Sequence, residues 1–155
     1  MRFPSVSGTN LQRRRMTLPR DLAGEINLLL VAFWQRHQAL VDTWMPLAQR
    51  IEERYEGFAA YELPVIQNRS RFSRWFIDSG MRAGIPNPQV RERTITLYLD
   101  KAEFLDALEI SDDGTIYAIL VDRSGEVLWH NRGPLDPAKK SDLMAFLDSR
   151  STPAP

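Results

Sequence analysis

The feature that most constrains the fold is the run from Ile26 to Phe33, in which every residue except Asn27 is apolar. A strand with one solvent-exposed face alternates apolar and polar residues, whereas a run without alternation is typical of a strand covered on both faces. Such a strand lies in the middle of a sheet with helices packed on each side. The run is too short to cross a bilayer. The sequence therefore predicts an α/β domain built around this strand.

A long helix is predicted directly after this strand, from about His37 to Tyr55. Its apolar residues have the spacing of one buried stripe, which consists of Leu40, Trp44, Leu47, Ala48, Ile51 and Tyr55. Pro46 falls inside this pattern. We expect it to kink the helix, because proline supplies no N–H and its ring crowds the carbonyl four residues back.

The segments on either side of this unit also show strand and helix patterns. Phe3 to Leu18 predicts a hairpin that turns at Gly8 to Asn10. Its second strand would carry Arg13 to Arg15, either as a solvated edge that discourages edge pairing or as a patch for an acidic partner. Asp136 can cap a final helix that starts at Pro137. Further strands are predicted at 57–65, 94–99, 115–121 and 126–130, and further helices at 71–83 and 101–108.

One domain is expected over residues 1–149, followed by a flexible tail at 150–155. The apolar strand after the long helix implies a right-handed crossover between parallel strands. Asp122 to Gly125 predicts a hairpin turn between the last two strands. We therefore expect a five-stranded mixed sheet, with its last strand antiparallel to the neighbouring strand and with the order 94–99, 57–63, 27–33, 115–121, 126–131.

Composition excludes several kinds of chemistry. The chain has no cysteine, so it offers no disulfide, no thiolate nucleophile and no cysteine metal ligand. It has two histidines and a formal net charge of zero, which argues against a multi-histidine metal site and a nucleic-acid-binding surface. No phosphate-binding loop or paired catalytic carboxylates are recognisable. We expect no metal, no cofactor and no membrane span, and a location in the cytoplasm.

The order of the elements resembles the thioredoxin-like superfamily, in its peroxiredoxin and thiol-reductase form. The residues that carry the resemblance are Gly8, Leu11 and Leu18 in the N-terminal segment, Phe33-Trp34, Pro46 and the segment Leu120 to Gly125. The family typically has Phe-Trp-Ala-x-Trp-Cys-x-x-Cys before the kinking proline. Alignment on these residues places Gln38 at the first cysteine position and Val41 at the second. A weaker resemblance, carried by Gly114 to Gly125, is to the mitochondrial ATP-synthase assembly-factor family with a thioredoxin-like fold.

A second family feature is also absent. Redox members have a cis-proline just before the strand that corresponds to 115–121, and here Thr115-Ile116 occupies that place. The resemblance therefore implies the scaffold of a thiol oxidoreductase without its chemistry. Thiol–disulfide exchange and peroxide reduction are excluded because no sulfur nucleophile is present.

Three hypotheses for function remain. The first is a protein-binding module, with an assembly or chaperone-like role, that uses the former active-site surface. Its binding residues would be Trp34, Arg36, His37, Gln38, Thr115 and Ile116. The second is an enzyme or binding protein that holds an anionic small molecule at the start of the helix near His37, where free N–H groups favour negative charge. The third is a stable scaffold without a site. The sequence leaves enzymatic activity open, inclining to none, and also leaves a homo-oligomer open.

Individual side chains at this place have competing interpretations. His37 is expected to be an exposed residue at the helix start rather than a general base, because Asp42 lies five residues on and shares its helix face poorly. Trp34 is expected to be partly exposed, as an anchor for a partner. Trp44 and Trp75 lie on apolar stripes and are expected in the core. His130 is expected at an exposed edge.

Overall fold

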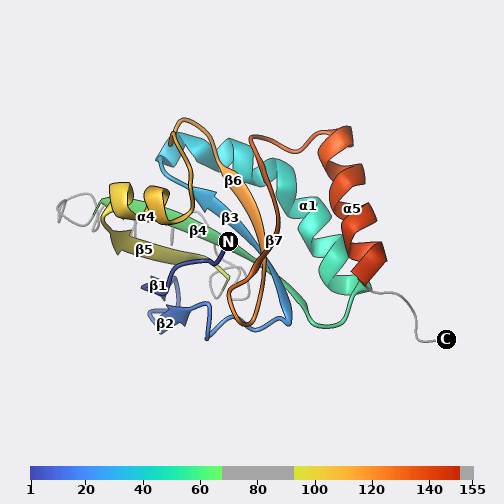
Figure 1. Ribbon diagram of the computed structural model, residues 1–155, viewed down its shortest axis with the longest axis horizontal. Coiled ribbons are helices and arrows are strands. Elements are labelled where there is room, and N and C mark those ends of the chain that lie inside the picture. Colours follow the sequence, from blue (N-terminus) through green and yellow to red (C-terminus); the bar gives the residue numbers. More distant parts are fainter. Residues whose placement is uncertain (68–92, 151–155) are drawn as a thin grey trace.

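The computed structural model describes residues 1–67 and 93–150, and Figure 1 shows a twisted sheet with helices packed against it. The predicted helix at 71–83 with Trp75, the segment expected to stop it, and the last five residues lie outside the described ranges. The elements are β1 (Val6–Asn10), β2 (Arg15–Leu18), β3 (Ile26–Ala32), η1 (Gln35–His37), α1 (Gln38–Arg54), β4 (Phe58–Gln67), β5 (Ile95–Leu99), α4 (Lys101–Ala107), β6 (Tyr117–Asp122), β7 (Val127–Arg132) and α5 (Pro137–Arg150).

The predicted order of five adjacent strands, β5-β4-β3-β6-β7, is confirmed, but the sheet is larger than expected. Its order is β2-β1-β5-β4-β3-β6-β7. The strands β3, β4 and β5 run parallel, whereas β6 is antiparallel to β3 and β7 is antiparallel to β6. The prediction of five strands was wrong because the N-terminal hairpin joins the same sheet, through pairing of Thr9 with Thr96 and Asn10 with Ile95.

The turn of this hairpin lies later than predicted. Gly8 is inside β1, where an added Cβ would lie 2.5 Å from the carbonyl oxygen of Thr96. The glycine therefore permits the close approach of β1 to β5, and it does not make a turn. The turn follows Asn10, whose side-chain oxygen accepts hydrogen bonds from the N–H groups of Gln12 and Arg14, both at 2.9 Å. Of the three arginines, only Arg15 lies on β2.

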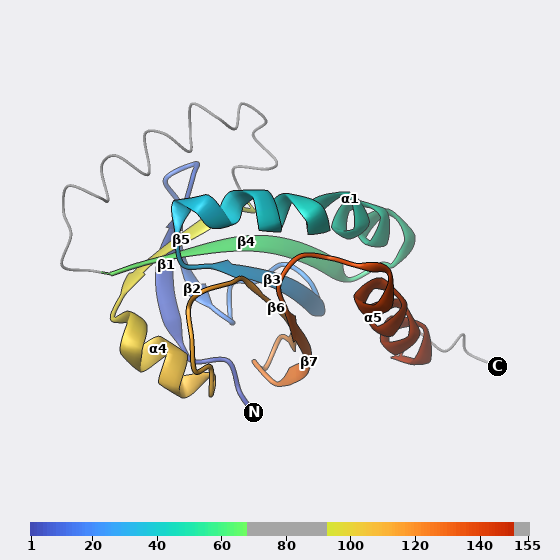
Figure 2. The ribbon, with the colours of Figure 1, turned by 90° about the horizontal axis from the view of Figure 1, so that it is seen from above.

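The strand β3 is covered on both faces, as its sequence predicts. Leu29 and Val31 face a cluster with α4 and the N-terminal segment, while Leu28 and Leu30 face a cluster with α1 and α5. Figure 2 shows α1 and α4 on opposite sides of the sheet. In the described ranges no helix combines the length and apolarity that crossing a membrane requires.

Most of the predicted stripe of α1 is buried. Trp44, Leu47, Ala48 and Ile51 lie in the core, whereas Leu40 is only partly buried and Val41 takes its place. Val41, Trp44 and Ala48 are spaced by three and four residues and so lie on one face of the helix, which means that the stripe starts one residue later than predicted. Pro46 lies inside the helix, which continues through it. Asp136 caps α5, accepting a hydrogen bond from the N–H of Lys139 at 2.8 Å.

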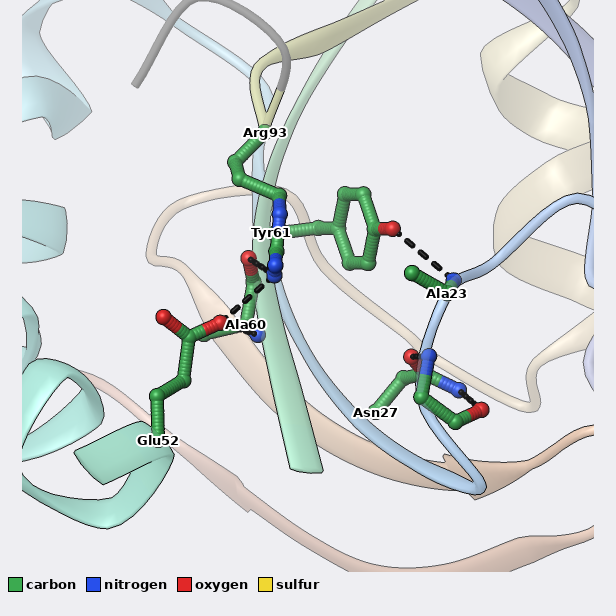
Figure 3. A network of polar contacts seen from close by, with 7 residues as sticks. Ala23, Asn27, Glu52, Ala60, Tyr61 and Arg93 are labelled. Carbon is green, nitrogen blue, oxygen red and sulfur yellow. Dashed lines mark hydrogen bonds and ion pairs between the residues drawn. The ribbon is translucent and has the colours of Figure 1, made fainter. Parts of the chain in front are cut away.

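An ion pair closes the edge of β4 where β5 has not yet begun (Figure 3). Glu52, in the last turns of α1, accepts a hydrogen bond from the N–H of Ala60 at 2.9 Å and pairs with Arg93. Arg93 also reaches the carbonyl of Ala60 and lies over the ring of Tyr61, 5.1 Å from its centroid. Side chains thus satisfy backbone groups of Ala60 that no strand pairs on this side.

Replacement of Glu52 tests this edge. Glu52→Ala leaves the Ala60 N–H and the Arg93 guanidinium without their carboxylate, so we expect the free energy of unfolding to fall by about 1–3 kcal/mol. The matched control is Glu53→Ala at the exposed neighbouring position, which we expect to change stability by less than about 0.5 kcal/mol. Urea titration of the three proteins measures both values. Equal stabilities for the two variants would contradict the role of Glu52.

Candidate functional site

The candidate site lies at the carboxyl end of β3, where the chain passes through Phe33 and Trp34 into η1 and then α1. In open α/β sheets this edge is where ligands bind. Trp34 is 44% exposed, and among the described residues it is one of two large hydrophobic side chains classed as exposed, with Met1. The prediction of a partly exposed tryptophan at this place is confirmed.

Three contacts hold the exposed indole of Trp34 in place. Its Nε1–H donates a hydrogen bond to the carbonyl of Asp113 at 3.1 Å. The ammonium of Lys101 lies 3.7 Å from the ring centroid, and the guanidinium of Arg36 lies 5.3 Å from it. Both distances are within the range of cation–π attraction. Trp34 is therefore an ordered side chain with cationic neighbours.

Lys101 was not predicted as part of the site. Its ammonium donates a hydrogen bond to the carbonyl of Phe33 at 2.9 Å, which fixes it against the turn that carries Trp34. Burial lowers the pKa of Lys101, and the charge of Asp113 opposes that effect. Lys101 is the first residue of α4, far along the chain from Trp34, and no local pattern in the sequence could connect the two.

The prediction that His37 is exposed was wrong, because its side chain is only 1% exposed. Its Nδ1 accepts a hydrogen bond from the N–H of Phe33 at 3.1 Å, and its ring meets the Phe33 ring edge-on. An accepting Nδ1 places the proton of a neutral ring on Nε2. Burial first, and then the charge of Arg36, lower the pKa of His37. The histidine therefore acts as a neutral support for the turn.

The second ring nitrogen of His37 has no hydrogen-bond partner within the described ranges. Nε2 is buried and makes no hydrogen bond, although the backbone of Gly114 is near enough to raise the pKa of the ring. Because the ring is covered, it is not placed to take a proton from a substrate in solvent. Its assignment to a binding surface stays a prediction.

The other predicted binding residues differ in how far their side chains are exposed. Arg36 is exposed and Gln38, the first residue of α1, is partly buried. Thr115 is also partly buried, on the side of Gly133. Ile116 is fully buried in the cluster with α1, and its carbonyl accepts a hydrogen bond from the N–H of Gly133 at 2.9 Å. The structure thus brings Trp34 and Arg36 together with Lys101 and places Ile116 in the core.

A buried carboxyl group, not singled out in the sequence, lies beneath the start of α1. Glu62 on β4 is 6% exposed and hydrogen-bonds with the side chain of Gln38. The amide of Gln38 also donates to Asp42 at 2.9 Å, so one side chain serves two carboxyl groups. Burial raises the pKa of Glu62 from 4.5 to about 7; the Gln38 contact lowers it and the charge of Asp42 raises it. In the sequence, the one indication of this buried carboxyl group was a glutamate within the largely apolar segment that forms β4.

The start of α1 has no side-chain cap and no acidic residue in its first turn. The N–H of Gln38 donates to the carbonyl of Gln35 in η1, and the helix dipole with the neighbouring Arg36 makes this end of the helix positive. Gln38 and the buried Val41 occupy the positions that the resemblance assigns to the two cysteines. Within residues 1–67 and 93–150, no three histidine or acidic side chains lie close enough together to hold a metal ion.

Comparison with solved structures supports the fold assignment. The chain is similar to BsSco, a member of the Sco family of cytochrome c oxidase assembly proteins, with TM-score 0.64, 14% identity and coverage of 99% of this chain and 95% of that one. It is also similar to a putative thiol:disulfide interchange protein DsbE from Chlorobium tepidum, with TM-score 0.60, 16% identity and coverage of 96% and 94%. An exposed lipoprotein thioredoxin from Streptococcus pneumoniae matches with TM-score 0.57, 12% identity and coverage of 94% and 99%.

No protein-family model matches the sequence, and no curated protein is similar to it. The structural likenesses establish a thioredoxin-like fold. Since the 155 residues contain no cysteine, this scaffold lacks the group that thiol–disulfide exchange requires. The chain is therefore a thioredoxin-like module without thiol redox chemistry. The weaker resemblance to the ATP-synthase assembly-factor family stays a prediction.

Glu62 makes the stability of the protein depend on pH. Its pKa is higher in the folded than in the unfolded protein, so the folded state binds more protons between about pH 4.5 and 7. Stability is therefore full below this range and falls as the pH rises through it. Glu62→Gln keeps the neutral form at every pH. We expect the variant to gain about 3 kcal/mol over the wild type between pH 4 and pH 8, since a tenfold change in proton affinity corresponds to about 1.4 kcal/mol.

Denaturant unfolding of both proteins across this range measures the difference. Asp42→Asn serves as the second variant, because removal of the neighbouring charge should move the Glu62 midpoint to lower pH. A side-chain ¹³C titration of Glu62 reports that midpoint directly. A stability difference between wild type and Glu62→Gln that is constant from pH 4 to pH 8 would contradict the raised pKa.

Proposed function

We propose that this chain is a thioredoxin-like protein-binding module that contacts its partner through Trp34, Arg36, Gln38 and Lys101, here called the Trp34 surface. The observation that carries the proposal is the state of Trp34, which is exposed and yet held by a hydrogen bond and two cations. An ordered, exposed indole loses little conformational freedom when a partner covers it. Tryptophan and arginine are the side chains most enriched among residues that dominate binding energy.

The charges around the indole indicate the chemistry of the partner. Arg36 and Lys101 flank the ring, and the uncapped start of α1 adds partial positive charge. Acidic residues on the partner would complement this surface and speed association. We therefore expect a partner segment that places an apolar or aromatic group on Trp34 and acidic groups around it.

The alternative of an anionic small molecule has weaker support. An anion at the start of the helix would have Arg36 and His37 as its ligands, but His37 is buried and its Nδ1 already accepts the Phe33 N–H. Arg36 remains available on its own. For the same reason the proposed surface leaves out His37 and Ile116, which are covered, and Thr115, which lies beside Gly133.

An assembly or chaperone-like role is one form of this proposal. Among the similar structures, BsSco is described as a member of a family of assembly proteins. That likeness, at 14% identity, supports a shared scaffold, and the role is carried over as part of the proposal only. A cytoplasmic location belongs to the proposal in the same way.

Affinity capture with the purified, immobilised chain tests the Trp34 surface. The variants are wild type, Trp34→Ala, Arg36→Glu and the matched control Arg50→Glu, which makes the same charge change at an exposed position further along α1. Thermal melts confirm that each variant is folded. We expect a partner retained from native lysate by wild type and by Arg50→Glu, and lost with the two variants of the surface.

The purified partner then allows a quantitative measurement. Calorimetric titration should show at least roughly tenfold weaker binding for Trp34→Ala and for Arg36→Glu, as is typical of residues that dominate an interface. Arg50→Glu should bind like the wild type. Equal retention by all four proteins, or no protein retained by the wild type, would overturn the proposal.

A further inference from the structure

A second concave site lies on the face of the sheet opposite α1. It is a cavity of about 360 Å³ between the carboxyl end of α4 and the strands β6 and β7. Leu108 and Ile110, from the end of α4 and the loop after it, and Ile119 from β6 give it apolar walls. His130 and Arg132 from β7 also line it. We call it the α4–β7 cavity.

The strand register explains why polar and apolar groups meet there. In the antiparallel pairing of β6 with β7, Ile119 lies opposite His130 and Tyr117 lies opposite Arg132. Paired residues point to the same face of a sheet, so both basic side chains stand beside the apolar cluster that contains Ile119 and Tyr117. His130 and Arg132, two residues apart on one strand, form one polar side of the cavity.

Two contacts hold Arg132 in position and leave some of its N–H donors unpaired by them. Its guanidinium bonds Asp112 at 3.1 Å and lies 5.7 Å from the centroid of the Tyr117 ring. The Tyr117 hydroxyl in turn donates to the carbonyl of Asp112 at 2.9 Å. A guanidinium has five N–H donors in a fixed fork that suits a carboxylate, so the bond with Asp112 leaves donors for a ligand.

We propose that the α4–β7 cavity binds a small amphipathic carboxylate, whose apolar body lies against Leu108, Ile110 and Ile119 and whose carboxylate is bound by Arg132 and His130. The volume is near the lower limit of ligand pockets, which is roughly 300 Å³, and about twice that of a cavity that holds benzene. A bicyclic ring or a chain of about eight carbons fits this size. Glu109 also lines the cavity and Asp112 already pairs with Arg132, which disfavours a multiply charged anion such as phosphate.

Titration with indole-3-acetate and with the neutral indole-3-acetamide tests the proposal. The two probes share the ring and differ in the charge of the head group. Using the ¹⁵N-labelled full chain, we expect indole-3-acetate to shift the amide signals of Ile119, Val127 and Arg132, with a dissociation constant of about 1 mM for a ligand of this size. Indole-3-acetamide should bind at least fivefold more weakly.

Variants distinguish a cavity that recognises the carboxylate group from one that binds any molecule of suitable size. Arg132→Gln should weaken indole-3-acetate at least fivefold and leave indole-3-acetamide unchanged. Asp112→Asn keeps Arg132 and removes its competing carboxylate, so indole-3-acetate should bind more tightly than to the wild type. The control Arg15→Gln changes an exposed arginine on the far edge strand β2 and should have no effect.

Several outcomes would overturn the proposal. These are the absence of shifts around the cavity at 10 mM indole-3-acetate, equal binding of the two probes, or equal affinities of wild type and Arg132→Gln. Trp34→Ala should bind indole-3-acetate like the wild type, because Trp34 does not line this cavity. Failure here and failure of the proposed protein-binding surface are therefore separate results.

Discussion

The burial of β3 on both faces is the constraint on which the other elements depend. A strand without a solvated face needs a layer on each side, and α1 with α5 supplies one while α4 with the N-terminal segment supplies the other. Because β3 lies between β4 and β6, its carboxyl end leads to a turn between α1 and the loop before β6. The same burial that stabilises the sheet therefore determines where Trp34 leaves the core.

The start of α1 shows how one scaffold position can change its chemistry. In the family that the chain resembles, the helix end stabilises a thiolate, whereas here the corresponding Gln38 is neutral and bonds two carboxyl groups. Asp42 is exposed and Glu62 is buried, so the shared amide couples a solvated charge to one beneath the helix. Gln38 thus contacts carboxyl groups at the position where the family has a thiol.

Local patterns in the sequence were sufficient to predict the central strands, the buried side of α1 and the cap at Asp136. These features depend on residues close together in the chain, whose spacing records which face is buried. The errors concern contacts between distant segments. Gly8 was interpreted as a turn residue because the group that requires a glycine there, the Thr96 carbonyl, lies on β5, far away in the sequence. Lys101 was missed for the same reason.

Burial of polar side chains was the other limit of prediction. His37 ends η1 and directly precedes α1, at a helix start where most side chains are solvated, and only the fold shows that its ring accepts the Phe33 N–H. Glu62 interrupts an apolar strand, but the identity of its neighbours depends on how α1 crosses the sheet. Sequence could indicate that such a residue is unusual, and the partner that makes it tolerable had to come from tertiary structure.

The short loop of Asp112 and Asp113 connects the two surfaces of the molecule. The carbonyl of Asp113 holds the indole of Trp34, while the carbonyl and carboxylate of Asp112 hold Tyr117 and Arg132. Because Asp112 and Asp113 are neighbours in the chain, a rearrangement of this loop would change both sets of contacts. Two ligands that each bind one arrangement of this loop more tightly than another would therefore alter each other's affinity, and thermodynamic reciprocity makes that effect equal in both directions.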